Sequence, residues 1–151
     1  MIIKSLQTDS ERKACLEIAR NLPEWFNEAG LRAIEEDLKS EITFIALEKE
    51  VLGFITVKPI NKKALEILWM AVKREHHGKG IGSRLLLVVE EWAREKDFEV
   101  LVVKTSGELN YKPCDKTRCF YEKMGFARVA LVDPYPEWGE SALIYVKMYK
   151  M

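Results

Sequence analysis

Four stretches of the chain carry apolar residues at the three-to-four-residue spacing of an α-helix that packs one face against a core. The first follows Thr8 and extends to about Asn21, and Thr8 with Glu11 three residues later forms the pattern of a capping box. The others cover about residues 28–39, about residues 81–96, and a shorter segment capped at Asp115 and closed by Gly125. The pattern therefore predicts four helices, of which the last is the shortest.

Seven shorter apolar runs, bounded by polar or turn-forming residues, predict β-strands. They cover residues 2–6, 43–47, 51–57, 65–72, 99–104, 126–132 and 142–149. The second and third runs are joined by a short polar turn and predict a hairpin. The run 65–72 is apolar except for Glu66, as expected of a central strand that is covered on both faces. Longer loops are predicted at 105–113 and at the aromatic-rich segment 133–139.

In chain order these elements read β-α-α-β-β-β-α-β-α-β-β, which predicts a mixed α/β fold around one sheet. The chain has 151 residues, so we expect a single domain over 1–151 that buries about two-thirds of its chain surface. Apolar residues make up 48% of the sequence, which argues against global disorder.

The charge balance excludes several classes of partner. Lysine plus arginine and aspartate plus glutamate both number 24, so neither a nucleic-acid interface nor a polybasic membrane surface is indicated. No apolar run approaches the length of a membrane span, and the polar start does not resemble a signal peptide, so we expect a cytoplasmic protein. Three cysteines without a paired motif predict neither a disulfide framework nor a zinc site, and no metal is expected.

Three glycines stand in five positions between the strand that ends at Val72 and the helix near residue 81. Gly78, Gly80 and Gly82 allow a tight bend and a close approach of the backbone to a ligand. The free amides at the start of the helix form an anion site that the helix dipole strengthens, so a phosphate-bearing ligand is the first hypothesis. The alternative is a glycine-rich turn that binds no ligand.

Two common phosphate motifs do not fit this cluster. The P-loop requires its lysine after the last glycine, whereas Lys79 stands between the first two glycines. The dinucleotide fingerprint requires a third glycine where Ser83 stands, and an acid at the end of the next strand rather than at its start. A nicotinamide-dependent oxidoreductase is therefore a disfavoured alternative.

A third pattern, Gln/Arg-x-x-Gly-x-Gly/Ala, fits as His77-Gly-Lys-Gly80-Ile-Gly82. A second segment, Cys119-Phe-Tyr-Glu-Lys-Met-Gly-Phe126, matches a Phe-Tyr-x-x-x-Gly-Phe signature between a helix and a strand. With these motifs and this element order, nearly the whole chain resembles the GNAT superfamily of acetyl-CoA-dependent N-acetyltransferases. The resemblance implies an acyl-CoA N-acyltransferase fold, a mixed twisted sheet of about seven strands with about four helices. His77 departs from the family, which usually has Gln or Arg there.

The resemblance also implies acetyl-CoA as the acetyl donor and assigns the residues that hold it. In the family a bulge separates the strand 65–72 from the next strand and frees main-chain groups, here those of Met70 and Val72. The expected coenzyme-binding residues are Met70, Ala71, Val72, His77, Gly78, Lys79, Gly80, Ile81, Gly82, Ser83, Arg84, Asn110 and Tyr121.

Acetyl transfer to an amine requires a base, because a lysine-like amine with a pKa near 10.4 is almost fully protonated at neutral pH. Glu66 is the acid inside the apolar strand and resembles the catalytic glutamate of histone-type GNAT enzymes. Tyr121 matches the family's general-acid tyrosine, which protonates the departing thiolate. Direct transfer in a ternary complex is the expected route, and a covalent route through Cys119 or Cys114 is a less favoured alternative.

The acceptor is predicted only as a primary amine on a small molecule or peptide. Large aromatic residues could line its pocket and favour an apolar or flat part, although such residues also fill cores. These candidates are Trp25, Phe26, Trp69, Tyr135 and Trp138. A non-catalytic acyl-CoA-binding module is the alternative function, since it would need neither Glu66 nor Tyr121. The family resemblance is consistent with a monomer and with a homodimer that forms through the C-terminal strands.

Overall fold

The computed structural model describes residues 1–149, apart from the side chain of Cys114. Its seven strands and four α-helices confirm the expected mixed α/β fold and the expected element order. The strands are β1 (Ile2–Ser5), β2 (Ile42–Leu47), β3 (Val51–Pro59), β4 (Ala64–Val72), β5 (Val100–Ser106), β6 (Ala127–Tyr135) and β7 (Glu140–Met148). The helices are α1 (Asp9–Arg20), α2 (Glu28–Ser40), α3 (Ile81–Glu95) and α4 (Pro113–Lys123), and a short 3-10 helix, η1, covers Arg74–His76. The single domain predicted over 1–151 ends with two residues, 150 and 151, that lie outside the described residues.

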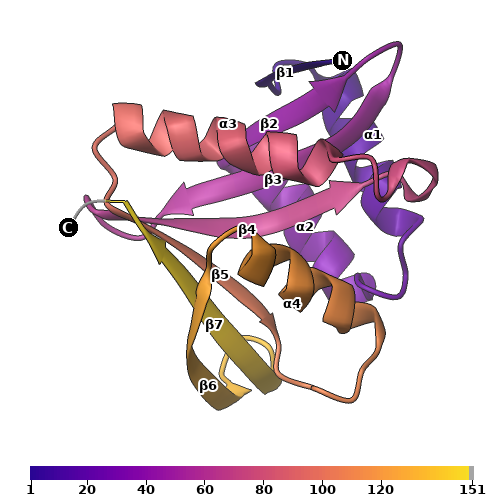
Figure 1. The fold of residues 1–151 in the computed structure, drawn as a ribbon. Helices are drawn as coiled ribbons and strands as arrows, with labels where there is room; N and C mark the ends of the chain where they lie inside the picture. The colour runs from indigo at the N-terminus through magenta and orange to yellow at the C-terminus, as the bar shows by residue number, and fades with distance from the viewer. Residues whose placement is uncertain (150–151) are drawn as a thin grey trace.

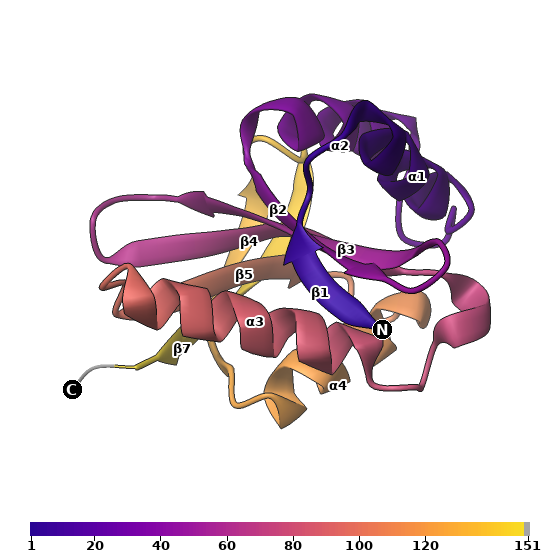
Figure 2. The ribbon, with the colours of Figure 1, turned by 90° about the horizontal axis from the view of Figure 1, so that it is seen from above.

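All seven strands form one sheet in the order β1-β2-β3-β4-β5-β7-β6. Neighbouring strands are antiparallel except β4 and β5, which are parallel and joined by α3. Helices α1 and α2 cover one face of the sheet, whereas α3 and α4 cover the other (Figures 1 and 2). No helix within residues 1–149 is long and apolar enough to cross a membrane.

Two apolar cores follow from this arrangement, one on each face of the sheet. The core under α3 and α4 includes Leu65, Ile67 and Tyr121, together with Leu85 and Val89 of α3. The core under α1 and α2 is smaller and includes residues of both helices, of β3 and of β4. Strand β4 therefore contributes to both cores, as its nearly continuous apolar sequence predicts.

Local sequence signals explain where the first two helices begin. The Thr8 side chain accepts a hydrogen bond from the Glu11 amide, and the Glu11 carboxylate accepts one from the Thr8 amide, which confirms the predicted capping box. At α2 the Asn27 side chain accepts from the Gly30 amide at 2.8 Å. The second cap also fixes the end of the segment Pro23–Asn27, which becomes part of the candidate site.

Two predicted boundaries are wrong. Helix α4 begins at Pro113, where a proline suits the first turn, so Asp115 lies inside that turn and pairs with Arg118 instead of capping the helix. Residues 133–135 of the predicted loop 133–139 belong to β6, whereas residues 136–139 form the tight turn to Glu140, which pairs with Tyr135. Gly139 closes this hairpin with a φ of +69°, a conformation that glycine adopts without strain.

The central strands β4 and β5 separate partway along their length. Their pairing extends only from Ala64 opposite Val100 to Ile67 opposite Val103, although β4 continues to Val72 and β5 to Ser106. The β3–β4 register shifts at the same level, because Thr56 and Val57 of β3 face Trp69 and Ile67, which leaves Leu68 as the extra residue of a bulge. The sheet thus opens into a gap beyond Ile67 and Val103, and Figure 1 shows α4 beside it.

Candidate active site

Main-chain groups of two β4 residues face the gap. The Lys73 amide donates to the Leu52 carbonyl of β3 at 2.8 Å, and in an antiparallel pair alternate residues turn toward the same neighbour. Ala71 and Trp69 therefore direct their peptide groups at β3, whereas Val72 and Met70 direct theirs toward β5, which is no longer paired there. Met70 and Val72 thus lie as expected for coenzyme binding, and Ala71 does not face the gap.

The glycine segment leads from the end of β4 into α3. Gly78 and Gly80 have φ values of +77° and +80°, and no other atom lies within 4 Å of the position that a Cβ would take at either. Gly80 is the N-cap residue of α3 without a side-chain cap, and the first helical bond runs from the Arg84 amide to the Gly80 carbonyl at 3.1 Å. The amides of Ile81, Gly82 and Ser83 are consequently the free N-terminal donors of this helix, and they open onto unfilled space.

Gly82 connects this helix start to the gap. A Cβ at Gly82 would stand 3.6 Å from the Met70 methyl group and 3.6 Å from the Phe120 ring of α4. A larger side chain there would enter the space between α3, α4 and β4. The missing side chain at Gly82 therefore lets the start of α3 pack against Met70 and Phe120.

His77 is bound to the end of β4. Its Nε2 atom lies 2.6 Å from the Val72 carbonyl oxygen, and with the proton on Nε2 the ring donates to that oxygen. The ring also meets the Trp25 indole edge-on, with centroids 6.0 Å apart. Although His77 occupies the position of the family's usual Gln or Arg, its ring here contacts the strand end and the α1–α2 segment.

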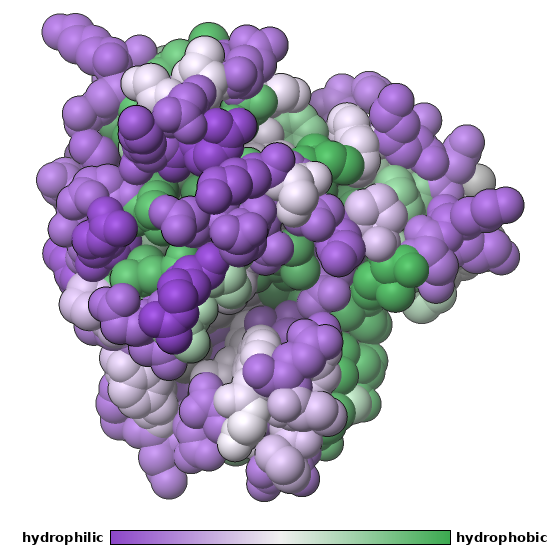
Figure 3. Space-filling model, turned by 180° about the vertical axis from the view of Figure 1, so that it is seen from behind, coloured by the Kyte–Doolittle hydropathy of each residue, from purple (hydrophilic) through white to green (hydrophobic). Residues whose placement is uncertain are grey.

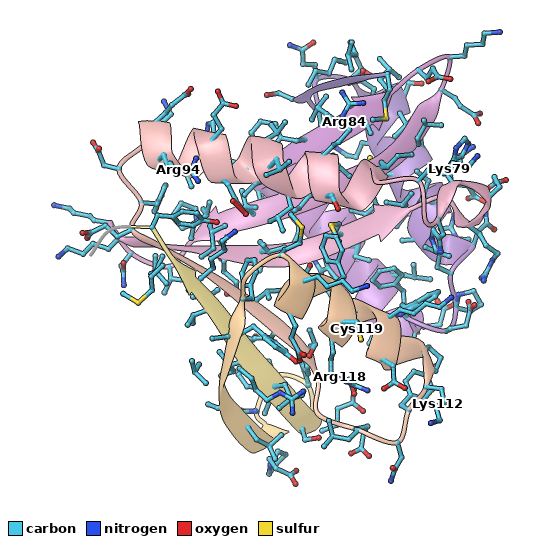
Figure 4. The ribbon with its side chains drawn as sticks, viewed as in Figure 1. Lys79, Arg84, Arg94, Lys112, Arg118 and Cys119 are labelled. Atoms are coloured by element: carbon cyan, nitrogen blue, oxygen red, sulfur yellow. The ribbon has the colours of Figure 1, made fainter. Side chains whose placement is uncertain are left out.

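The cations predicted for the phosphates lie on different sides of α3. Figure 4 shows Lys79 on the loop before α3, at the end of the sheet where the gap opens. Gly82 faces α4, and two residues advance a helix by roughly 200°, so Arg84 points away from α4. Asn110 is exposed on the loop before α4. Phosphate contacts of these three side chains stay predictions.

Tyr121 lies in the core beside the gap. It is 3% exposed and packs edge-on against the rings of Phe120 and Phe126, with centroids 5.1 and 5.3 Å away. Burial raises the pKa of the Tyr121 phenol above its ordinary value. The phenol therefore stays protonated near neutral pH and is available as a proton donor.

Glu66 lies one residue before the point where β4 and β5 separate, and its carboxylate is occupied. Lys104 of β5 places its Nζ 2.9 Å from Glu66 Oε2, and only 15% of the Glu66 side chain and 19% of the Lys104 side chain are exposed. The same Nζ donates to the Tyr135 hydroxyl at 2.5 Å and lies 4.5 Å from the Tyr135 ring centroid. Partial burial alone would lower the pKa of Lys104, but the hydrogen bonds to Tyr135 and Glu66 outweigh it and raise that pKa.

The aromatic residues predicted for the acceptor form two groups. Phe26 meets Trp69 edge-on at 6.2 Å, and the Trp69 indole donates to Asp37 of α2 at 2.7 Å. Tyr135 meets Trp138 edge-on at 5.3 Å on the β6–β7 hairpin. Figure 3 shows a hollow on this side of the molecule, between the helices α1 and α2 and the β6–β7 hairpin.

Trp25 connects three segments at the mouth of the gap. Its indole donates to the Pro113 carbonyl at 3.0 Å, while its ring contacts His77. The neighbouring Glu24 carboxylate accepts two bonds from Arg74, at 2.6 and 2.7 Å. We call Pro23–Asn27 the bridging segment, because it joins η1 and the start of α3 to the loop before α4.

Other candidate groups have no role in this geometry. Cys119 is exposed on α4, and the Cys114 side chain lies outside the described part of the chain. Across the described side chains, no three His, Cys, Asp or Glu residues gather as a metal site would require. The covalent route thus gains no support from the Cys119 position.

Sequence reasoning missed several partners of the predicted residues. Sequence reasoning did not pair Lys104 with Glu66, although Val102 lies opposite Glu66 and Lys104 follows two residues later on the same face of the sheet. Asp37 and Arg74 belong to no recognisable sequence motif. Asp37 binds Trp69 and Arg74 binds Glu24, and each partner is distant in sequence. Their roles depend on the tertiary arrangement alone.

Known proteins resemble both the sequence and the fold. A model described as the acetyltransferase (GNAT) family matches residues 8–126. An uncharacterized N-acetyltransferase of Methanocaldococcus jannaschii is 34% identical over 84 residues, which are 54% of this chain and 49% of that protein. The match therefore spans about half the length of that relative.

Solved structures confirm the fold. A GNAT-family protein of Desulfovibrio desulfuricans superposes with a TM-score of 0.84 at 19% identity, over 97% of this chain and 98% of that chain. Aminoglycoside 6′-N-acetyltransferase complexed with coenzyme A gives a TM-score of 0.78 at 20% identity, over 98% and 97% of the two chains. At these identities the likeness establishes the acyl-CoA N-acyltransferase fold and leaves the acceptor open.

Proposed function

Because this chain belongs to the GNAT family of acetyltransferases, an acyltransferase family, we propose that it moves an acetyl group from acetyl-CoA to a primary amine. Transfer is direct, in a ternary complex of enzyme, acetyl-CoA and amine. One observation carries the proposal: the peptide groups of Met70 and Val72 turn toward the side where β4 and β5 no longer pair, and the free amides at the start of α3 follow this strand along the chain.

Each part of acetyl-CoA has a matching group on β4 or at the start of α3. The amides of Gly80 to Ser83 bind the pyrophosphate, and the peptide groups of Met70 and Val72 bind the pantetheine arm. The thioester then lies where β4 and β5 separate, so a β4 amide can stabilise the developing oxyanion. When the coenzyme binds, its amide competes with His77 for the Val72 carbonyl.

Proton transfer is assigned to two residues on opposite faces of the sheet. Glu66 faces the α1–α2 side and accepts the amine proton, directly or through water. Tyr121 faces the α3–α4 side and protonates the thiolate. The amine therefore approaches from the hollow beside α1 and α2 while the coenzyme occupies the other side.

The acceptor remains defined only as an amine on a small molecule or peptide. The proposal that Phe26, Trp69, Tyr135 and Trp138 contact it is supported by the hollow near both aromatic groups. The structurally similar aminoglycoside 6′-N-acetyltransferase makes amines of that kind reasonable first candidates for assay. A cytoplasmic location stays a prediction of the sequence.

Coenzyme binding and turnover test the proposal in two steps. Acetyl-CoA at a hundred times its dissociation constant should stabilise the protein by about 2.7 kcal/mol in a thermal shift assay, and NAD should not. Released thiol, measured over a panel of amines, aminoglycosides and peptides, should identify the acceptor. Binding without turnover on any amine would instead favour a non-catalytic acyl-CoA-binding module.

The Tyr121→Phe variant separates the chemical step from binding. It should lower kcat about a hundredfold or more while the acetyl-CoA thermal shift is kept, because only the proton donor is lost. Phe126→Leu is the control, since it alters packing against the same ring but removes no hydroxyl group. An unchanged kcat in Tyr121→Phe would remove this residue from the mechanism.

A further inference from the structure

The partner of Glu66 is unusual for a general base. Lys104 supplies an ammonium 2.9 Å from the carboxylate, and both side chains are mostly enclosed. A free carboxylate would turn toward whichever cation or water is nearest. Here its direction is set by a fixed neighbour on the adjacent parallel strand.

Lys104 is itself held in place from a third strand. The Tyr135 hydroxyl accepts a hydrogen bond from the Lys104 ammonium, and the Tyr135 ring lies 4.5 Å from the same Nζ atom. Lysine side chains normally lose considerable rotamer freedom when they are fixed in one geometry. Two contacts from one tyrosine, together with the carboxylate, define that geometry here.

Other charged groups near Glu66 are directed elsewhere. Lys58 stands directly opposite Glu66 in the β3–β4 register, yet its Nζ lies 3.8 Å from Glu41. On α2, Asp37 accepts the Trp69 indole N–H on the same face of the sheet. Among the side chains described for residues 1–149, Lys104 is thus the cation that pairs with Glu66.

We propose that Lys104 is the positioning residue of Glu66, whose carboxylate it holds in place at the point where β4 and β5 separate. The inference rests on the proposed function, in which Glu66 receives the amine proton. It also gives Tyr135 a role in supporting the base, beside or in place of acceptor binding.

This arrangement predicts how the reaction depends on pH. An ammonium beside a carboxylate favours its charged form, so removal of Lys104 makes protonation of the base easier. Activity that needs the ionised carboxylate is then lost at a higher pH than in the wild type. The acid limb of kcat/KM should move upward by about one pH unit in Lys104→Met.

The test compares pH profiles of kcat/KM for the best amine found in the screen. Lys104→Met should shift the acid limb and reduce activity about tenfold on its acid side, while Lys104→Arg, which keeps the charge, should restore the wild-type limb. Lys58→Met is the matched control, because it removes a lysine opposite Glu66 that does not contact it. A purely structural ion pair would lower the melting temperature without moving the limb.

A second measurement does not require turnover. Titration of 13C-labelled glutamate carboxyl groups by NMR, with the Glu66 signal assigned by its loss in Glu66→Gln, should show a higher midpoint in Lys104→Met than in wild type. An active enzyme whose limb and midpoint stay unchanged in Lys104→Met, or shift equally in Lys58→Met, would overturn the inference. A protein that binds no acyl-CoA and acetylates no amine would overturn the proposed function, whatever the titration shows.

Discussion

At the scale of single residues, the glycine loop shows why particular positions lack side chains. Gly78 and Gly80 need positive φ angles, and Gly82 faces Met70 and Phe120 at contact distance. These are two separate requirements, one on backbone conformation and one on space. Gly80 is the sharper case to test, because it is also the N-cap residue of α3.

Gly80→Ala should cost about 1 kcal/mol of unfolding free energy, since a Cβ is disfavoured at a φ of +80°. It should also weaken acetyl-CoA binding, because the added methyl group enters the open space over the helix amides. Calorimetric titration with acetyl-CoA and urea denaturation measure the two effects.

Gly139→Ala is the matched control for this prediction. Gly139 has a similar φ of +69° with equally open surroundings, but it lies in the β6–β7 hairpin. We expect the same loss of stability with an unchanged dissociation constant for acetyl-CoA. Equal weakening of binding in both variants would show that strain, rather than the site, is responsible.

At the scale of elements, an ion pair joins α3 to strand β7. Glu90, 3% exposed, accepts from Lys147 of β7 at 3.0 and 3.3 Å, and Lys147 also donates to the Met124 carbonyl at 2.6 Å. A buried carboxylate without its partner is costly, because water cannot replace the lost ammonium. This contact holds the helix that carries the glycine loop.

Lys147→Met should therefore lower the unfolding free energy by about 2–4 kcal/mol, measured by urea denaturation. Lys63→Met removes an ammonium 3.5 Å from Glu99 in a more exposed pair and should cost less than about 1 kcal/mol. Restoring most of the loss by the double change Lys147→Met with Glu90→Gln would identify the stranded carboxylate as the cause. Similar losses in the two single variants would contradict this account.

Elements with strong local signals could be predicted from sequence, and those set by distant partners could not. The box at Thr8 and Glu11 acts within one turn, so α1 begins where expected. The end of β6 depends on Tyr135 pairing with Glu140 and on its bond to Lys104, neither of which a local pattern carries. For this reason the predicted loop 133–139 includes the last three residues of β6, although residues 136–139 do form the turn.

The candidate site divides in the same way. The glycine loop and Tyr121 were recognisable because the chemistry of each lies in a short motif. Lys104 and the bond between His77 and Val72 depend on how β4, β5 and η1 meet in space. Sequence could therefore single out Glu66 as the proposed base, whereas its partner Lys104 required the fold.

At the scale of the whole molecule, β6 forms the outer edge of the sheet. Val129 and Leu131 of this strand are 55% and 58% exposed, and Figure 3 shows apolar surface along this side of the molecule. Exposed edge strands with apolar side chains favour pairing with another chain. Of the two states that the family resemblance leaves open, a homodimer formed along this edge would cover these side chains.

We expect Leu131→Lys to reduce self-association in sedimentation experiments over rising protein concentration, because a charge on the edge strand disfavours pairing. Leu87→Lys is the control, since Leu87 is 54% exposed on α3, away from this edge. If both variants and the wild type sediment alike as monomers, the monomer is the working state.

The extra residue at Leu68 divides β4 into two regularly paired stretches. Before Leu68, Glu66 of β4 and Lys58 of β3 lie on one face of the sheet. After Leu68, Trp69 of β4 and Thr56 of β3 lie on that same face. Glu66 and Trp69 thus share a face although they are three positions apart rather than two. Deleting Leu68 would leave Glu66 and Trp69 two positions apart, as in a regular strand, so both residues would keep their face of the sheet and only the bulge would be lost. Deleting a paired residue such as Ile67 would instead exchange the faces of everything on one side of it, so we expect such a deletion to be tolerated far less than the loss of Leu68.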